Sequence, residues 1–145
     1  MKYYTPEGFS PTQSVGFLLA KARNLLTAEM DTALKDLNIT GPQMGILLMM
    51  QRRQASTPYE LSKTLSVDTG LMTRMLDKLE RRGLLERSRS VDDRRVVNLL
   101  LSKKGEQIAA EISNLAPEVL NARLTKLTKA EFEELCRLLN KFIAE

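Results

Sequence analysis

The sequence predicts a mainly α-helical fold that carries one short β-hairpin, and three observations support this prediction. Apolar residues recur at spacings of three and four over most of the chain, which is the period of an amphipathic helix. Between residues 84 and 101 they alternate instead, as they do in short strands. A helix pair that starts at the capping box of Thr57 and Glu60 ends at Gly83, directly before this alternation.

The composition is that of a single globular domain of 145 residues, with 43% hydrophobic and 28% charged residues. No apolar run approaches the roughly 18 residues that a membrane span needs, and the N-terminus lacks a signal-peptide pattern, so we expect a cytoplasmic protein. The single cysteine excludes an intrachain disulfide, and the absence of histidine removes the commonest metal ligand and general base. Because no catalytic constellation is present either, we expect no enzyme activity, metal or cofactor.

The first third of the chain contains an arm and two helices. Residues 1–10 carry aromatic side chains that either pack across a partner subunit or belong to a loose terminus. From Pro11 to near Asn38 the spacing predicts one long amphipathic helix. Thr40 and Pro42 mark the start of the next helix, and residues 51–56 form a polar connector.

The middle of the chain predicts two helices at a tight corner. The first begins at Thr57 and is short, because Ser66–Asp68 follows with a turn and a second N-cap. The second helix has an apolar stripe composed of Met72, Met75, Leu76 and Leu79. Its opposite, polar face consists of Thr69, Gly70, Thr73, Arg74, Asp77 and Lys78.

Two short strands, at residues 84–89 and 96–101, flank a basic tip at Ser90–Arg95. Helix, turn, helix and then a hairpin is the layout of a winged helix-turn-helix, whose second helix enters a DNA major groove while the two-stranded β wing reaches the flanking minor groove. Charge agrees with this interpretation. Between Arg52 and Lys104 there are 13 Lys and Arg against 7 Asp and Glu, an excess of +6, so the remainder of the +4 chain carries −2.

The last third predicts two further helices. Ser102 caps the first of them, and Pro117 should kink or end it. Thr128 and Glu131 form a second capping box that opens the last helix. The apolar stripe of this helix consists of Phe132, Leu135, Cys136, Leu139, Phe142 and Ile143.

The outer helices, within residues 1–38 and 104–145, have apolar stripes that a small monomer does not cover. We therefore expect them to form a helical dimerisation region around a two-fold axis, with residues 39–103 as the winged DNA-binding unit of one domain. A homodimer would place two recognition helices about 34 Å apart, which matches a palindromic site in double-stranded DNA.

The segments Leu65–Asp68 and Leu71–Leu84, together with the wing, resemble the MarR family of transcriptional regulators. Members of that family have a recognition helix, a wing of the form D-x-R and, several residues later, the pattern L-T-x-x-G. Ser102 replaces the usual threonine and keeps a hydroxyl that can cap the next helix. The residues in register with the family pattern are Asp93, Arg95, Leu101 and Gly105.

The resemblance and the polar faces together predict the DNA contacts. Arg74 either reads a guanine or contacts a phosphate, and Lys63 and Ser66 either contact phosphates or are merely solvent-exposed. Arg95 is expected to enter the minor groove, oriented by a charge-assisted hydrogen bond to Asp93. The predicted DNA-contact residues are Lys63, Ser66, Asp68, Thr69, Gly70, Thr73, Arg74, Lys78, Asp93, Arg94 and Arg95.

The family resemblance also implies a repressor that releases DNA when a phenolic or other aromatic acid binds between the dimer helices and the winged unit. An aromatic carboxylate requires apolar walls and one cation. Residues that could supply them are Phe17, Lys21, Arg23 and Met44. Two alternatives are a redox switch at Cys136, where burial would make the thiol inert, and nonspecific architectural DNA binding, which the modest net charge disfavours.

Overall fold

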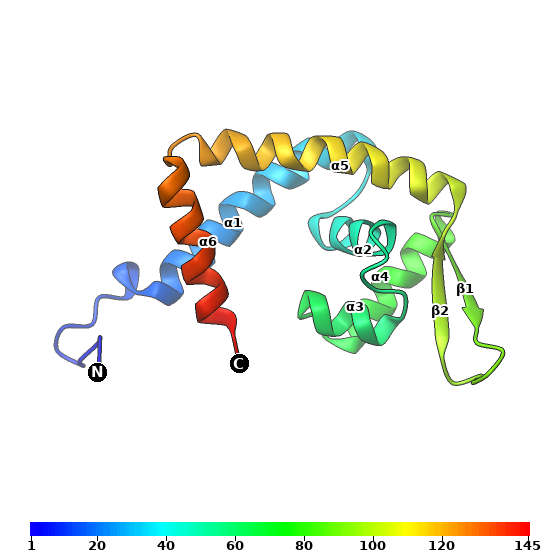
Figure 1. Cartoon of the computed structure of the whole chain (residues 1–145), viewed down its shortest axis with the longest axis horizontal. Coiled ribbons are helices and arrows are strands. Elements are labelled where there is room, and N and C mark those ends of the chain that lie inside the picture. Colours follow the sequence, from blue (N-terminus) through cyan, green and yellow to red (C-terminus); the bar gives the residue numbers. More distant parts are fainter.

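The computed structural model describes residues 1–145 and confirms a mainly helical winged helix-turn-helix fold with one two-stranded antiparallel sheet. The long helices α1 and α5 cross at the top of Figure 1. The winged unit is joined to one end of α5, and α6 follows the other end. None of the helices has the length and apolar character needed to cross a bilayer. The elements are η1 Pro11–Gln13, α1 Val15–Leu34, η2 Lys35–Leu37, α2 Gly41–Gln51, α3 Pro58–Leu65, α4 Thr69–Arg81, β1 Leu85–Arg89, β2 Val97–Leu101, α5 Lys103–Leu124 and α6 Lys129–Ile143.

The first long helix is shorter than the sequence predicts, because both of its ends tighten into 3-10 turns. At the N-terminal end, Ser14 is extended and its hydroxyl accepts the N–H of Phe17, so the α-helix starts at Val15 instead of Pro11. At the C-terminal end, Asn38 adopts the left-handed conformation with φ 53°, which asparagine tolerates better than most residues. The expectation of one helix from Pro11 to Asn38 is therefore wrong at both ends, where 3-10 turns flank the α-helix.

The hydrophobic core lies where α2, α3 and α4 meet the first half of α5 and the strands. The stripe predicted on α4 is confirmed, since Met72, Met75, Leu76 and Leu79 are all buried. Fully buried side chains from the other elements are Leu34, Ile46, Leu47, Leu61, Leu84, Leu85 and Ile112. This core determines which face of α4 is turned to solvent.

The N-terminal cap of α3 differs in one detail from the predicted capping box. The Thr57 hydroxyl accepts the N–H of Glu60 at 3.2 Å, as expected. The carboxylate of Glu60 accepts the Thr57 hydroxyl at 3.1 Å instead of the main-chain N–H of Thr57. Only one backbone donor is therefore satisfied here, whereas Thr128 and Glu131 at the start of α6 form the complete reciprocal box.

The junction between the wing and α5 depends on Gly105. Ser102 donates its N–H to the carbonyl of Leu84 at 3.0 Å, and its hydroxyl accepts the N–H of Gly105 at 3.0 Å. This draws the first turn of α5 onto the end of the helix-turn-helix. A Cβ atom at position 105 would lie 1.9 Å from the Leu84 carbonyl oxygen, so no side chain fits.

Helix α5 continues through Pro117 to Leu124, so the proline does not end it. Helix α6 follows at a corner and has no buried residue. Its capping box lowers the pKa of Glu131, because the carboxylate accepts hydrogen bonds from the main-chain N–H and the hydroxyl of Thr128. The large apolar side chains that α6 exposes are Phe132, Leu135, Leu138, Leu139, Phe142 and Ile143.

We expect Gly105→Ala to destabilise the fold, since a Cβ 1.9 Å from the Leu84 oxygen forces the backbone of α5 away from the wing. Overpacking of this kind costs about 1–3 kcal/mol or more. Urea denaturation followed by circular dichroism measures the change, with Lys104→Ala, an exposed position on the same turn, as the control. Equal stabilities of the two variants would contradict the close-approach argument.

Candidate nucleic-acid interface

The corner between α3 and α4 presents the start of α4 to solvent. Ser66 adopts the left-handed conformation with φ 52°, and the N–H of Val67 returns to the carbonyl of Ser62 at 3.0 Å, which makes the turn sharp. The Asp68 carboxylate then caps α4 by accepting the N–H of Leu71 at 2.9 Å. Asp68 therefore has a structural role at the helix start in addition to its predicted place in the interface.

The exposed face of α4 is small and polar near its N-terminus. The Thr73 hydroxyl donates to the carbonyl of Thr69 at 2.9 Å, which leaves its oxygen free to accept a hydrogen bond. A Cβ at Gly70 would lie 3.7 Å from a guanidinium nitrogen of Arg74 and 3.3 Å from a carboxylate oxygen of Asp68. The glycine thus leaves a gap beside Arg74 at which a nucleic-acid backbone can approach.

The wing is an antiparallel pair in which Leu85 lies opposite Leu101 and Arg89 opposite Val97. Its tip is held by polar contacts. The Ser90 hydroxyl accepts the N–H groups of Asp92 and Asp93 at 3.3 and 3.4 Å, and the Arg89 guanidinium donates to the carbonyl of Arg94 at 2.7 Å. Arg89 was not among the residues predicted from the sequence.

The role of Asp93 differs from the one expected. Its carboxylate accepts the main-chain N–H of Arg95 at 3.0 Å, and it makes no ion pair with the Arg95 guanidinium. A two-residue turn of this kind is the usual local hydrogen bond of aspartate. Asp93 therefore shapes the tip, and the side chain of Arg95 projects without a protein partner.

A second arginine that was not predicted to belong to the site joins the wing to α4. Arg87 on β1 forms an ion pair with Asp77 at 2.8 Å and approaches Glu80 at 3.5 Å, and its side chain is 28% exposed. The sequence pattern could have indicated this role, because the alternation of side chains along a strand places Arg87 on the same face as the buried Leu85. The pair fixes the wing relative to the polar face of α4.

The predicted cations stay free of such pairs. None of them forms an ion pair, whereas Arg87 on β1 is paired with two carboxylates. The exposed, unpaired cations are Lys63, Arg74, Lys78, Arg94 and Arg95. Unpaired cations on one helix face and on a wing tip are the kind of groups with which proteins contact DNA phosphates and base edges.

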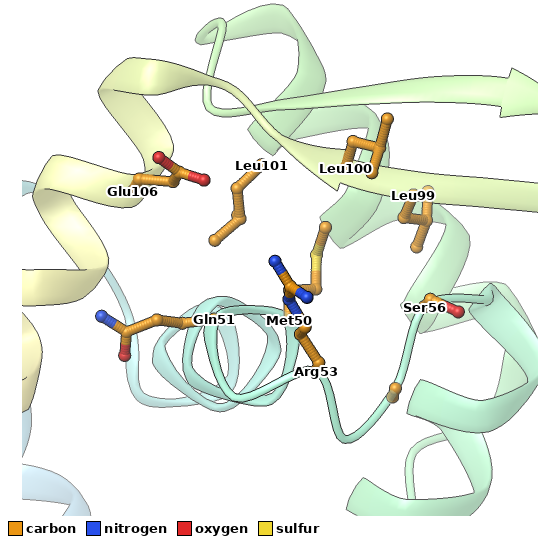
Figure 2. A pocket seen from close by; sticks show the side chains of 9 residues that line it. Met50, Gln51, Arg53, Ser56, Leu99, Leu100, Leu101 and Glu106 are labelled. Carbon is orange, nitrogen blue, oxygen red and sulfur yellow. The ribbon is translucent and has the colours of Figure 1, made fainter.

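Two cavities lie between the winged unit and α5. One, of about 580 Å³, lies between the end of α2, β2 and the first turn of α5. Figure 2 shows the Glu106 carboxylate to one side of Leu101 and the Arg53 guanidinium below it. The other, of about 480 Å³, lies between α2, α3 and α5. It has one cation, Arg52, and no carboxylate, and its apolar lining residues are Leu48, Met49, Leu65, Ala116 and Leu120.

The four residues predicted to bind a ligand do not line one cavity within the chain. Phe17 and Lys21 share a shallow hollow of about 330 Å³ on α1, and the Lys21 ammonium lies 6.0 Å from the centre of the Phe17 ring. Arg23 is exposed and does not line this hollow. Met44 is partly buried against the core. Cys136 is a free, half-buried thiol on α6.

Comparison with known sequences agrees with this geometry. Residues 39–97 match the model of the MarR family. The multiple antibiotic resistance protein MarR of Escherichia coli is 39% identical over 76% of this chain and 77% of its own length. Its counterpart in Salmonella typhimurium is 33% identical over 96% of this chain and 97% of its own length. The similarity therefore extends beyond the winged unit to the outer helices.

Comparison with solved structures gives the same result. The crystal structure of a mutant E. coli MarR with operator DNA has a TM-score of 0.81, with 32% identity over 90% of this chain and 94% of that one. A MarR family protein of Mycobacterium tuberculosis in complex with salicylic acid has a TM-score of 0.72, with 27% identity over 92% and 99%. With relatives this similar over most of its length, and with the winged unit matched by the family model, the chain belongs to the MarR family of DNA-binding transcriptional regulators.

Proposed function

We propose that this MarR-family regulator is a homodimeric repressor that binds a palindromic operator and is released by a small aromatic acid. The observation that carries the proposal is the set of unpaired cations on α4 and on the wing tip, in a fold similar to that of a MarR protein bound to operator DNA. Arg74 is assigned to a base edge in the major groove and Arg95 to the minor groove, with Arg94 beside it.

The remaining predicted residues are assigned supporting contacts. Thr69, Gly70 and Thr73 line the groove-facing start of α4, where short side chains allow close approach. Lys63, Ser66 and Lys78 contact phosphates on either side of the groove, and they fix the register of the protein without reading sequence. Asp68 and Asp93 hold the helix start and the wing tip, as their hydrogen bonds indicate.

The exposed apolar face of α6 supports the dimer. Six large apolar side chains on one helix of 15 residues are uncovered in the single chain, and α1 also exposes Val15, Phe17, Leu18 and Leu25. Apolar surface of this kind is typical of protein–protein interfaces. We assign residues 1–38 and 104–145 to the dimer interface and residues 39–103 to DNA binding.

The cavity between α2, α3 and α5 is the best candidate for the effector site. Its walls come from the winged unit on one side and from α5 on the other, so a ligand bound there can prefer one orientation of the two. Arg52 supplies the cation for a carboxylate, and the apolar residues supply the walls for a ring. The larger cavity of Figure 2 is less suited to an acid, because Glu106 lines it. Salicylic acid, present in the complex of the related M. tuberculosis protein, is a suitable probe.

The proposal is tested by fluorescence anisotropy with DNA from upstream of the protein's own gene and with a scrambled control. We expect the upstream fragment to bind at least about a thousandfold more tightly. Equal binding of both fragments, with affinity that collapses as salt increases, would favour an architectural DNA binder instead.

Arg74→Ala should weaken binding to the operator by about 5- to 150-fold, since a bidentate arginine contributes about 1–3 kcal/mol of base discrimination. Anisotropy titrations measure the loss, with Arg53→Ala, at an exposed and unpaired arginine outside the predicted DNA contacts, as a control that removes the same charge. A loss of the same size on scrambled DNA would assign Arg74 to a phosphate instead of a base.

Arg87→Ala should reduce DNA affinity more than it reduces stability. The lost ion pairs are partly exposed and contribute about 0.2–1 kcal/mol to folding, but they also fix the wing relative to α4. Urea denaturation and anisotropy measured on the same variant separate the two effects. Unchanged DNA affinity would show that the wing keeps its orientation without Arg87.

Arg52→Ala should leave operator binding intact and raise the salicylate concentration needed for DNA release by about 10- to 100-fold, as expected for the loss of a hydrogen bond to a charged group. The matched control is Arg53→Ala, because Arg53 follows directly in sequence but lines the other cavity. If release is equally impaired in both variants, or in the Arg53 variant alone, the effector does not bind in the cavity that Arg52 lines.

A further inference from the structure

A polar hollow, separate from the cavities described above, lies beside the C-terminal half of α4, where α4 meets the junction of η2 and α2. Its volume is about 320 Å³, and no apolar residue lines it. Six polar or charged residues form its lining: Asn38, Thr40, Gln43, Lys78, Arg81 and Arg82. Of these, only Lys78 was expected to have a role in binding.

Three cations converge on this hollow without a compensating carboxylate. None of these cations, Lys78, Arg81 and Arg82, forms an ion pair. No acidic residue lines the hollow. Arg82 is held in place, because its guanidinium donates to the carbonyl of Leu37 at 3.1 Å and to that of Asn38. Lys78 and Arg81 are exposed, and their charges are free to move toward a ligand.

A buried amide adds a neutral donor. Gln43 is only 8% exposed, and its Oε1 accepts the N–H of Thr40 at 3.1 Å. This hydrogen bond fixes the orientation of the amide, so that the opposite Nε2 group remains available and keeps access to solvent. The main-chain donors at the start of α2 are already used, since Asp31 accepts from Gly41 and Thr40 accepts from Gln43. An anion in the hollow would therefore be recognised by side chains alone.

We propose that this hollow binds a phosphate group. Two mobile cations, one fixed guanidinium and an amide donor match the several acceptor oxygens and the charge of a phosphate. The site continues the exposed stripe of α4, on which Gly70, Arg74, Lys78 and Arg81 follow one another at helical spacing. The phosphate comes either from the DNA backbone beyond the bases that Arg74 reaches, or from a free phosphorylated molecule. The first source rests on the proposed function, and the second does not.

The location gives the site a connection to the rest of the fold. Arg82 ties the end of α4 to the end of the segment that follows α1, so a phosphate beside it binds at the contact between the recognition helix and a predicted dimer helix. The site therefore lies at the junction between the winged unit and the predicted dimerisation region.

The test uses Arg81→Gln in the full-length protein, because Arg81 is exposed and makes no hydrogen bond or ion pair that the fold requires. Arg53→Gln is the matched control, because Arg53 is also exposed and unpaired but does not line the hollow. Circular dichroism establishes that both variants are folded. Arg82 is not substituted, since its hydrogen bonds to Leu37 and Asn38 are structural.

In the first arm, anisotropy is measured at several salt concentrations with both operator and scrambled DNA. If the phosphate belongs to DNA, Arg81→Gln reduces the slope of log Kd against log salt by about 0.9 with both DNAs, and the control leaves it unchanged. Because the scrambled DNA reports the same slope, this result stands even if the protein shows no operator preference.

In the second arm, the thermal midpoint of DNA-free protein is measured in inorganic phosphate and in chloride at equal ionic strength. If the site takes a free phosphate, phosphate raises the midpoint of the wild type and of the control by more than that of Arg81→Gln, which shows only the general stabilising effect of phosphate, and the salt slope on DNA is unaffected. The proposal is overturned if Arg81→Gln matches the control in both arms.

Discussion

The contact between the first turn of α5 and the carbonyl of Leu84 positions most of the molecule. It is the point at which the core of the winged unit is joined to the long helix, and it exists only because position 105 carries no side chain. The main chain of Ser102 bonds back to Leu84 at the same place, and its hydroxyl caps α5. The L-S-x-x-G pattern is therefore a requirement of packing: a capping hydroxyl and a glycine three residues apart let a helix begin against the end of another helix.

The arginines of this protein have two different roles. Arg87 and Arg82 serve the fold, one through the carboxylates of α4 and the other through main-chain carbonyls at the end of η2. Arg74, Arg81 and Arg95 form no ion pairs and lie on exposed surfaces. The first group holds the wing and the helix junction rigid, although Arg82 also lines the proposed phosphate site, and the second group keeps its charge for a partner. Binding to a polyanion then requires little rearrangement of the protein, which limits the entropic cost of association.

The helices and strands were predictable because they depend on local signals, whereas side-chain partners and cavities depend on packing. Capping residues such as Thr128 and the stripe from Met72 to Leu79 are encoded within one or two turns. Asp93 was expected to hold the guanidinium of Arg95, but the main-chain N–H two residues away is a closer donor for a short side chain. The hollow around Arg81 combines the end of α4 with the segment between α1 and α2, so no local pattern could predict it.

The lack of any buried residue in α6 has a consequence for folding. An isolated helix of 15 residues is marginal in water, and its own capping box adds only a modest contribution. In the proposed dimer the helix gains its stability from the partner chain. The fraction of chains in which α6 is folded therefore depends on the protein concentration. Dilution would then lower the thermal midpoint and fray α6 first, before the core of the winged unit opens.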